Sequence, residues 1–210
     1  MCSSMRVMLK LKQKLFVLIG IGGINLAAVT VPFLASGDTQ TSTTTVNLTI
    51  NPVLISWSSG PTVTLGAITP DSTGRQSTNS DTVSANTNDT AGLNITMESN
   101  TATQAMTSGG NTIAAGSGSP ASPATLTNNH WGWRIDSLAG FGAGPGAVLN
   151  SAAPSALTYA AVPAQGAPYT IKNTGTNGST SSTVWYSARV DNTQPIGSYS
   201  ATVLYTFNTN

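Results

Sequence analysis

The residues best suited to contact a ligand are two tryptophans that stand two positions apart. Trp131 and Trp133 flank Gly132 and follow His130. In an extended strand, side chains at positions i and i+2 lie on one face, so both indoles point the same way. Exposed, they would form a stacking platform for a sugar, with His130 beside it. Buried, each would contribute about 150 to 250 Å² to a core. The pattern favours the core, and a glycan-contacting site at these three residues is the alternative.

A second possible chemistry is a covalent crosslink between side chains. Lys172 is the only Lys after the N-terminal segment, and Glu98 is the only Glu in the chain. A Lys amine can attack an Asn amide when a nearby buried acid transfers the protons, and Asn residues are abundant here. However, Lys172 precedes the Asn173-Thr174-Gly175 sequence, which favours a turn. Lys172 is therefore expected at an exposed strand end, which disfavours a crosslink.

The remaining polar residues argue against metal and catalytic sites. Asp71, Asp81 and Asp89 could offer oxygen ligands to calcium, but they lack the D-x-D-x-D spacing of a calcium loop. One Cys and one His exclude a disulfide framework and a Cys/His zinc site. The sequence has no G-x-S-x-G, no P-loop and no paired carboxylates at a usable spacing. We expect no metal, no cofactor and no enzymatic activity.

Composition indicates the fold class. Only 7% of the 210 residues are charged, with 8 Lys and Arg against 7 Asp and Glu. A chain so poor in charge is not expected to bind nucleic acid through a basic surface, and it does not form long charged helices. Its polarity comes from Thr, Ser, Asn and Gly, which suit strands and turns better than helices. The composition predicts an all-β protein.

The first 36 residues are typical of an export segment. Arg6, Lys10, Lys12 and Lys14 form a basic head, and residues 15–35 are almost continuously apolar. A basic region followed by an apolar region and small residues is the pattern of a secretory signal peptide. Cleavage near Ala28 or near residues 35–36 is one outcome. The other is an uncleaved apolar helix, because 21 residues can span a membrane. Either outcome places the rest of the chain outside the cytoplasm, with membrane contact only through this segment.

After this segment the sequence predicts a Thr-rich spacer, 37–45, and one β-domain, 46–210. Apolar residues alternate with polar ones in several short runs, which is typical of half-buried strands. These runs are Val46/Leu48/Ile50, Val53/Ile55/Trp57, Val63/Leu65/Ala67, Val83/Ala85, Leu93/Ile95/Met97 and Tyr169/Ile171. Turn residues separate them. About nine or ten such strands favour an antiparallel, immunoglobulin-like β-sandwich.

Two segments and one pair of strands complete the expected organisation. Residues 101–130 and 137–167 are rich in Gly, Ser, Pro and Ala, and they are predicted to be two long, partner-facing loops. Residues 173–182 are predicted to be a tip between strands. Val184–Val190 and Tyr199–Phe207 alternate strongly and are joined by a Gln194-Pro195-Ile196-Gly197 turn, which predicts a closing hairpin.

Three blocks of sequence resemble known bacterial surface proteins. VSANTNDTAGLNITM (83–97), NNHWGWRIDSLAGFGAGPG (128–146) and TVWYSARVDNTQPIGSYSATVLYTF (183–207) are similar to secreted β-sandwich proteins of ultra-small bacteria of the candidate phyla. The stretch from Tyr199 to Phe207 also resembles the distal motif of WxL cell-wall-associated domains. There Tyr205 replaces the Trp of the motif, and the Trp-x-Leu element occurs only as Trp133-Arg134-Ile135.

The resemblance and the export segment lead to the same expectation. They imply a secreted or membrane-tethered protein of the bacterial surface, with a structural or adhesive role and no catalysis. Its expected partners are cell-surface or cell-wall components, glycans among them. The alternative is a carbohydrate-binding or cell-wall-binding module that uses Trp131 and Trp133.

Overall fold

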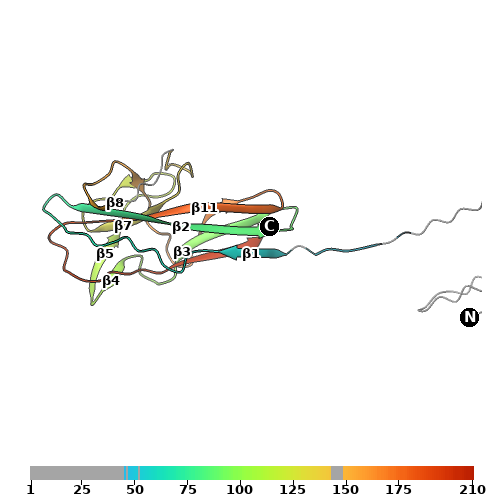
Figure 1. Ribbon diagram of the computed structural model, residues 1–210, viewed down its shortest axis with the longest axis horizontal. Coiled ribbons are helices and arrows are strands. Elements are labelled where there is room, and N and C mark those ends of the chain that lie inside the picture. The colour runs from blue at the N-terminus through green and yellow to red at the C-terminus, as the bar shows by residue number, and fades with distance from the viewer. Residues whose placement is uncertain (1–44, 46, 52, 143–148) are drawn as a thin grey trace, which may run out of the picture. The chain divides into compact units, whose positions relative to one another are not determined.

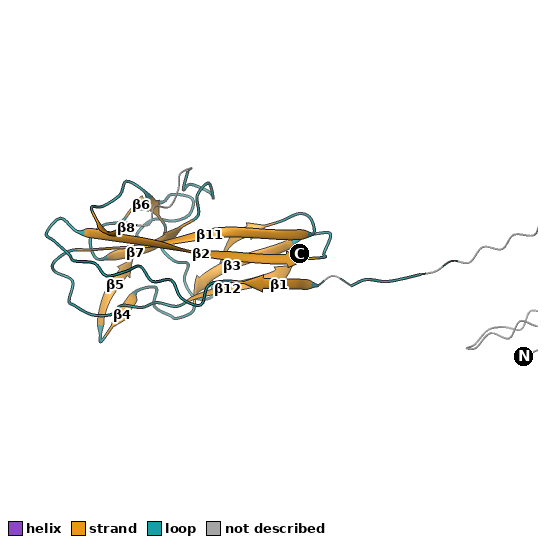
Figure 2. Cartoon of the chain, in the orientation of Figure 1, coloured by secondary structure: helices purple, strands orange, loops and turns teal. Residues whose placement is uncertain are grey.

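The protein is all-β in the part that the structure describes. A computed structural model describes residues 45, 47–51, 53–142 and 149–210, and these contain strands and turns but no helix. All of the strands belong to one compact unit, Thr49–Asn210 (Figure 2). The predicted export segment, and with it the predicted N-terminal apolar helix, lies outside the described residues. Among the described residues, no helix is long and apolar enough to cross a membrane.

The described residues form twelve strands. In chain order they are β1 (Leu54–Ser58), β2 (Arg75–Thr87), β3 (Leu93–Ser99), β4 (Met106–Ser108), β5 (Asn111–Ala115), β6 (Ala124–Thr125), β7 (His130–Arg134), β8 (Leu149–Ala152), β9 (Thr158–Tyr159), β10 (Tyr169–Asn173), β11 (Gly178–Val190) and β12 (Val203–Thr209).

Two strands of 13 residues each, β2 and β11, organise the larger sheet. They pair along their whole length without a register shift, from Gly178 opposite Thr87 to Val190 opposite Arg75. Each is bordered by shorter strands, in the order β1-β2-β11-β7-β5-β4, with β8 also on β2. Figure 1 shows the two long strands side by side, with β1 and β3 along one half and β7 and β8 along the other.

A smaller sheet, in the order β10-β3-β12, supplies the other side of the core. Leu93, Ile95 and Met97 alternate along β3 and are completely buried. They belong to one cluster with Val83 of β2 and Val184 of β11, so the two sheets pack against each other through their apolar faces. The period-two pattern predicted β2 and β3 here, because alternation marks the face that the core covers.

The larger sheet is mixed, so the expectation of a purely antiparallel arrangement is wrong. β5 lies parallel to β7, with Ala114 opposite His130 and Ala115 opposite Trp131. Residues 116–129 connect the two strands and include β6. A connection of this length can cross over and return in the same direction, which two parallel neighbours require.

The predicted closing hairpin is also wrong. β11 pairs with β2 and β7, whereas β12 pairs with β3 in the smaller sheet. The chain crosses from one sheet to the other between Val190 and Val203. Alternation correctly identified both apolar faces, but a face does not specify which strand lies beside it.

The two segments predicted as long loops contain regular structure. Residues 101–130 include β4, β5 and β6, and the described part of 137–167 includes β8 and β9. Tyr159, Ala160 and Val162 are at most 1% exposed. Ile113 and Leu126 of the first segment are each 4% exposed, so both segments contribute strands and buried apolar residues to the domain. Likewise, Gly178–Ser182 belongs to β11, where a tip was predicted.

The first predicted strand, Val46 to Ile50, does not form among its described residues. Leu48 is 83% exposed and Ile50 is 72% exposed, and neither belongs to a strand. The predicted strand at Val63 to Ala67 is also absent, although Val63 and Leu65 pack against the core as part of a loop. The segment around Leu48 thus carries a strand-like pattern without a paired neighbour in the described chain.

Candidate binding surface

The outer face of the larger sheet carries a regular array of uncharged polar side chains. It covers β1, the second half of β2 and the first half of β11. Opposite residues in the ladders are Ser58, Ser84 and Ser181 in one row, and Ser56, Asn86 and Ser179 in the next. Thr82 and Thr183 form a third row. We call these eight residues the hydroxyl face.

Strand alternation explains why these residues point outward. Val83 and Ala85 of β2 are buried, so Thr82, Ser84 and Asn86 lie on the opposite side of the sheet. The hydroxyls of Ser58 and Ser84 lie 2.8 Å apart and are hydrogen-bonded across the strands. The face contains no charged residue, which makes it suited to neutral partners with many hydrogen-bonding groups, such as sugar hydroxyls.

One edge of this face is open. β7 pairs with β11 only from Trp185 to Arg189, and within the described chain no strand covers β11 from Gly178 to Val184. A hollow of about 440 Å³ lies along this edge. It is lined by Ile135, Asp136, Lys172, Ser181, Ser182, Thr183 and Trp185. We call it the edge groove.

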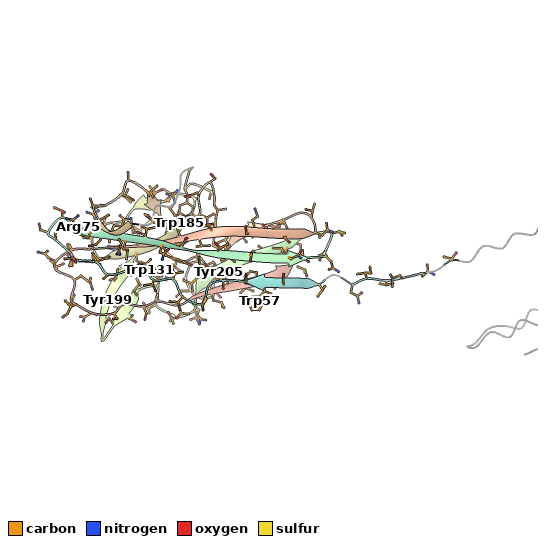
Figure 3. The ribbon with its side chains drawn as sticks, in the orientation of Figure 1. Trp57, Arg75, Trp131, Trp185, Tyr199 and Tyr205 are labelled. Carbon is orange, nitrogen blue, oxygen red and sulfur yellow. The ribbon has the colours of Figure 1, made fainter. Side chains whose placement is uncertain are left out.

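An aromatic pair links β1 of the larger sheet to β12 of the smaller sheet. Trp57 of β1 stacks on Phe207 of β12, with ring centroids 5.4 Å apart and an interplanar angle of 22°. Trp57 remains 63% exposed, and it borders a second, smaller hollow beside Ser56 and Asn86. Figure 3 shows Trp57 at β1 and Trp185 at β11. These are the two tryptophans that are not fully buried.

The structure places Trp131 and Trp133 in the core. They are 4% and 0% exposed, and their indole N–H groups donate to the carbonyl oxygens of Gln104 and Ala161, both at 2.8 Å. Trp131 stacks on Tyr186. Buried indoles with satisfied N–H groups offer no accessible face for a sugar to stack on.

His130 lies at the end of β7 and is partly exposed. Its Nδ1 is 2.9 Å from the Thr127 hydroxyl and 2.8 Å from the carbonyl oxygen of Asn128. The neighbouring loop is held by Asp191, which accepts hydrogen bonds from Thr193, Asn128 and Asn129. These bonds, those from Thr193 first, lower the pKa of Asp191 to about 2. His130 thus makes local hydrogen bonds beside two buried indoles.

The residues considered for a crosslink or for calcium make separate local contacts. Within the described chain, no ion pair or hydrogen bond joins Lys172 to Glu98, and Glu98 accepts from the backbone N–H of Gly166. Asp81 accepts from Gly60 N–H and Asp89 from Ala91 N–H. No group of three or more His, Cys, Asp and Glu side chains that could hold a metal occurs among the described residues.

Sequence reasoning did not identify the hydroxyl face or the edge groove. The signal was present in the runs SDTVSAN (80–86) and GSTSSTV (178–184), whose alternate positions are polar. Residues 178–182 were predicted to belong to a tip, and around Val83 and Ala85 only the apolar face of the strand was considered. Comparison of the chain with models of known families, with curated proteins and with solved structures finds no match.

Proposed function

We propose that this chain is an exported, non-catalytic protein of the bacterial surface with a structural or adhesive role, and that the hydroxyl face is its contact surface. The domain is proposed to be an immunoglobulin-like sandwich, in line with the resemblance to secreted sandwich proteins. Its partners are neutral, hydroxyl-rich components of the cell surface or cell wall.

The observation that carries this proposal is the absence of charge from three rows of polar side chains held in register. Ser, Thr and Asn groups offer both donors and acceptors, and strands fix their spacing at about 4.8 Å between neighbours. A contact of this kind gains little from long-range electrostatic steering and depends little on salt. A rigid array can also bind a repeating polymer at several points, which raises avidity.

Binding to purified cell-wall polysaccharide tests the proposal. The full chain is compared with Ser84→Lys/Ser181→Lys, which places two long charged side chains in the central row of the hydroxyl face. The matched control is Thr96→Lys/Thr206→Lys, which are opposite each other on the outer face of the smaller sheet. We expect the first variant to bind at least tenfold more weakly and the control to bind normally, at both low and high salt. Equal binding by all three chains would contradict the proposal.

A second candidate function is a carbohydrate-binding module that uses Trp57 in place of Trp131 and Trp133. The observation in its favour is that Trp57 is exposed and borders the hollow beside Ser56 and Asn86. Trp57→Leu keeps an apolar contact with Phe207 but removes the aromatic face. Loss of sugar binding at an unchanged melting temperature would favour this candidate, and unchanged binding would exclude it.

A further inference from the structure

We propose that copies of this chain join by strand addition, with residues 47–51 of one copy pairing along the open edge of β11 in another. The inference deepens the structural role proposed above, because it names a second copy as a partner. It depends on two features of the molecule: an exposed segment with a strand pattern, and a strand edge without a neighbour.

The donor segment has the pattern of a strand but pairs with no strand in the described part of the chain. Its sequence is NLTIN, in which the apolar Leu48 and Ile50 alternate with polar residues. Leu48 and Ile50 are 83% and 72% exposed and lie outside every strand. Alternation of this kind is stabilised when one face is covered and the other meets solvent. In addition, no charged residue occurs between Asp38 and Asp71 to disfavour such pairing.

The acceptor edge is long and has no bulge. Among the described residues, β11 is paired on one side only from Gly178 to Val184, and its register with β2 is continuous. Exposed edges in monomeric proteins are usually blunted by a bulge, a charge or a covering element. The edge strands β10 and β1 have bulges, between Thr170 and Lys172 and between Leu54 and Ser56, whereas the free edge of β11 has only the charges of Asp136 and Lys172 in its groove.

The donor segment can lie along the free edge of β11 with its apolar and polar side chains on separate faces. The free edge extends over seven residues, 178–184, which is long enough for the five residues of the donor segment, 47–51. A strand added there would turn Leu48 and Ile50 toward the core side of β11, where Ile135 offers apolar surface in the edge groove. Asn47 and Thr49 would then lie on the outer side, beside Ser181 and Thr183, and would extend the hydroxyl face by one strand.

The donor segment cannot reach this edge within its own copy. The Asn88 side chain donates to the carbonyl oxygen of Asn51 at 3.3 Å and accepts from Val53 N–H at 2.6 Å. These bonds hold the chain beside the end of β2, next to β1. A new strand beyond β11 would lie about 14 Å from β1, which is three strand spacings. Ile50 is only one residue from the anchored Asn51, a step of about 3.8 Å. A second copy must therefore supply the donor.

Disulfide trapping in the full chain tests this inference. Cys2→Ser removes the only native thiol, and Thr49→Cys is then combined with Ser179→Cys, Ser181→Cys or Thr183→Cys, one at a time. We expect at least one combination to give a ladder of multimers on a non-reducing gel, which reductant collapses to a single chain. The control pairs Thr49→Cys with Thr206→Cys on β12. No ladder from any β11 position, or an equal ladder from the control, would overturn the inference.

Two single-charge variants test the predicted orientation. Leu48→Asp in the trapping background should abolish the ladder, because it replaces the apolar contact with Ile135 by a carboxylate on the core side of the added strand, whereas Asn47→Asp should leave it intact. Equal effects of the two variants would also overturn the inference. The melting temperature should not change in either, since Leu48 is exposed in the single copy. If the chain forms ladders but does not bind polysaccharide, the strand addition is supported and the adhesive contact is contradicted. The two tests can therefore fail separately.

Discussion

The hydroxyls of Tyr186 and Tyr205 meet between the two sheets at 2.5 Å and are hydrogen-bonded. Tyr186 comes from β11 in the larger sheet, and Tyr205 comes from β12 in the smaller one. Tyr186 is 7% exposed and also donates to the sulfur of Met97. This pair is a polar link inside an otherwise apolar interface, so removal of either hydroxyl leaves the other without its main partner.

The first prediction concerns the energetics of this pair. Tyr205→Phe should lower the free energy of unfolding by about 1 to 3 kcal/mol, because the Tyr186 hydroxyl stays buried without a strong partner. Tyr186→Phe should cost a similar amount, whereas the double variant should cost clearly less than the sum. Chemical denaturation of the four chains gives the coupling. Strictly additive losses would show that the two hydroxyls do not depend on each other.

The second prediction concerns alkaline pH. Burial raises the pKa of both tyrosines above the usual value of 10.0. Above pH 10 the unfolded chain loses these two protons while the folded chain keeps them, so the free energy of unfolding falls as pH rises. The loss should be about 1.4 kcal/mol per pH unit for each phenol. Denaturation between pH 9 and pH 11.5 measures it. The Tyr186→Phe/Tyr205→Phe variant should show a shallower decline, and an identical decline would contradict the assignment.

The third prediction separates a core role from a ligand role at Trp133. Trp133 is fully buried, packs against Phe141 in an edge-to-face arrangement and donates to the carbonyl oxygen of Ala161. Trp133→Ala should lower the free energy of unfolding by about 3 to 5 kcal/mol. Trp57→Ala should cost much less, because Trp57 is 63% exposed. Thermal unfolding of both variants decides the matter. A Trp133→Ala chain with normal stability and lost glycan binding would contradict the core role.

The fourth prediction uses two glycines with the same backbone conformation. Gly92 and Gly110 both have a φ of 89°. A Cβ at Gly92 would lie 2.0 Å from the carbonyl oxygen of Thr174, whereas a Cβ at Gly110 would meet nothing within 4 Å. Gly110→Ala should therefore cost only the backbone strain, about 1 kcal/mol.

Gly92→Ala should cost considerably more than Gly110→Ala, because the turn between β2 and β3 must move away from Thr174. It should also weaken the bond from Asn210 N–H to the carbonyl oxygen of Gly92, which ties down the C-terminus. Melting temperatures of the two variants give the comparison. Equal losses would mean that the turn adjusts freely.

Strand faces were predictable from the sequence, but strand partners were not. Leu93, Ile95 and Met97 alternate and are buried as the pattern predicted. The same pattern in Val184–Val190 and Tyr199–Phe207 predicted a hairpin, yet β12 joins β3. Strands that follow each other in sequence often pair, which is why a hairpin was predicted. Nothing in the short connection between these two strands indicates that the chain crosses to the other sheet.

Buried polar residues were the other limit of the sequence reasoning. Gln76, Ser77 and Thr78 belong to none of the predicted strands, but they are at most 1% exposed in β2. Their side chains are satisfied by partners far along the chain, such as Ser187, which is 2.9 Å from the Gln76 amide nitrogen and 2.8 Å from the Thr78 hydroxyl. Hydrogen bonds to such distant partners offset the free-energy cost of burying polar side chains, and the local sequence does not reveal these partners.

The hydroxyl face was missed for a related reason. Ser, Thr and Asn are common in turns, and the runs around Ser84 and Ser181 contain few large apolar residues. Pairing between the two long strands, together with the apolar residues of β3 beneath them, holds these runs extended. Tertiary contacts thus override the local preference.

The proposed contact with components of the cell surface requires the folded domain to lie outside the cytoplasm. Cell fractionation followed by N-terminal sequencing of the chain, expressed from Met1 in a bacterial host, measures this most directly. We predict that the domain is accessible to protease added outside the inner membrane. Its N-terminus should start near residue 29 or 37 after cleavage, or it should retain Lys14 in the membrane fraction as a tether. A soluble cytoplasmic chain that starts at Met1 and is protected from added protease would contradict the proposed function.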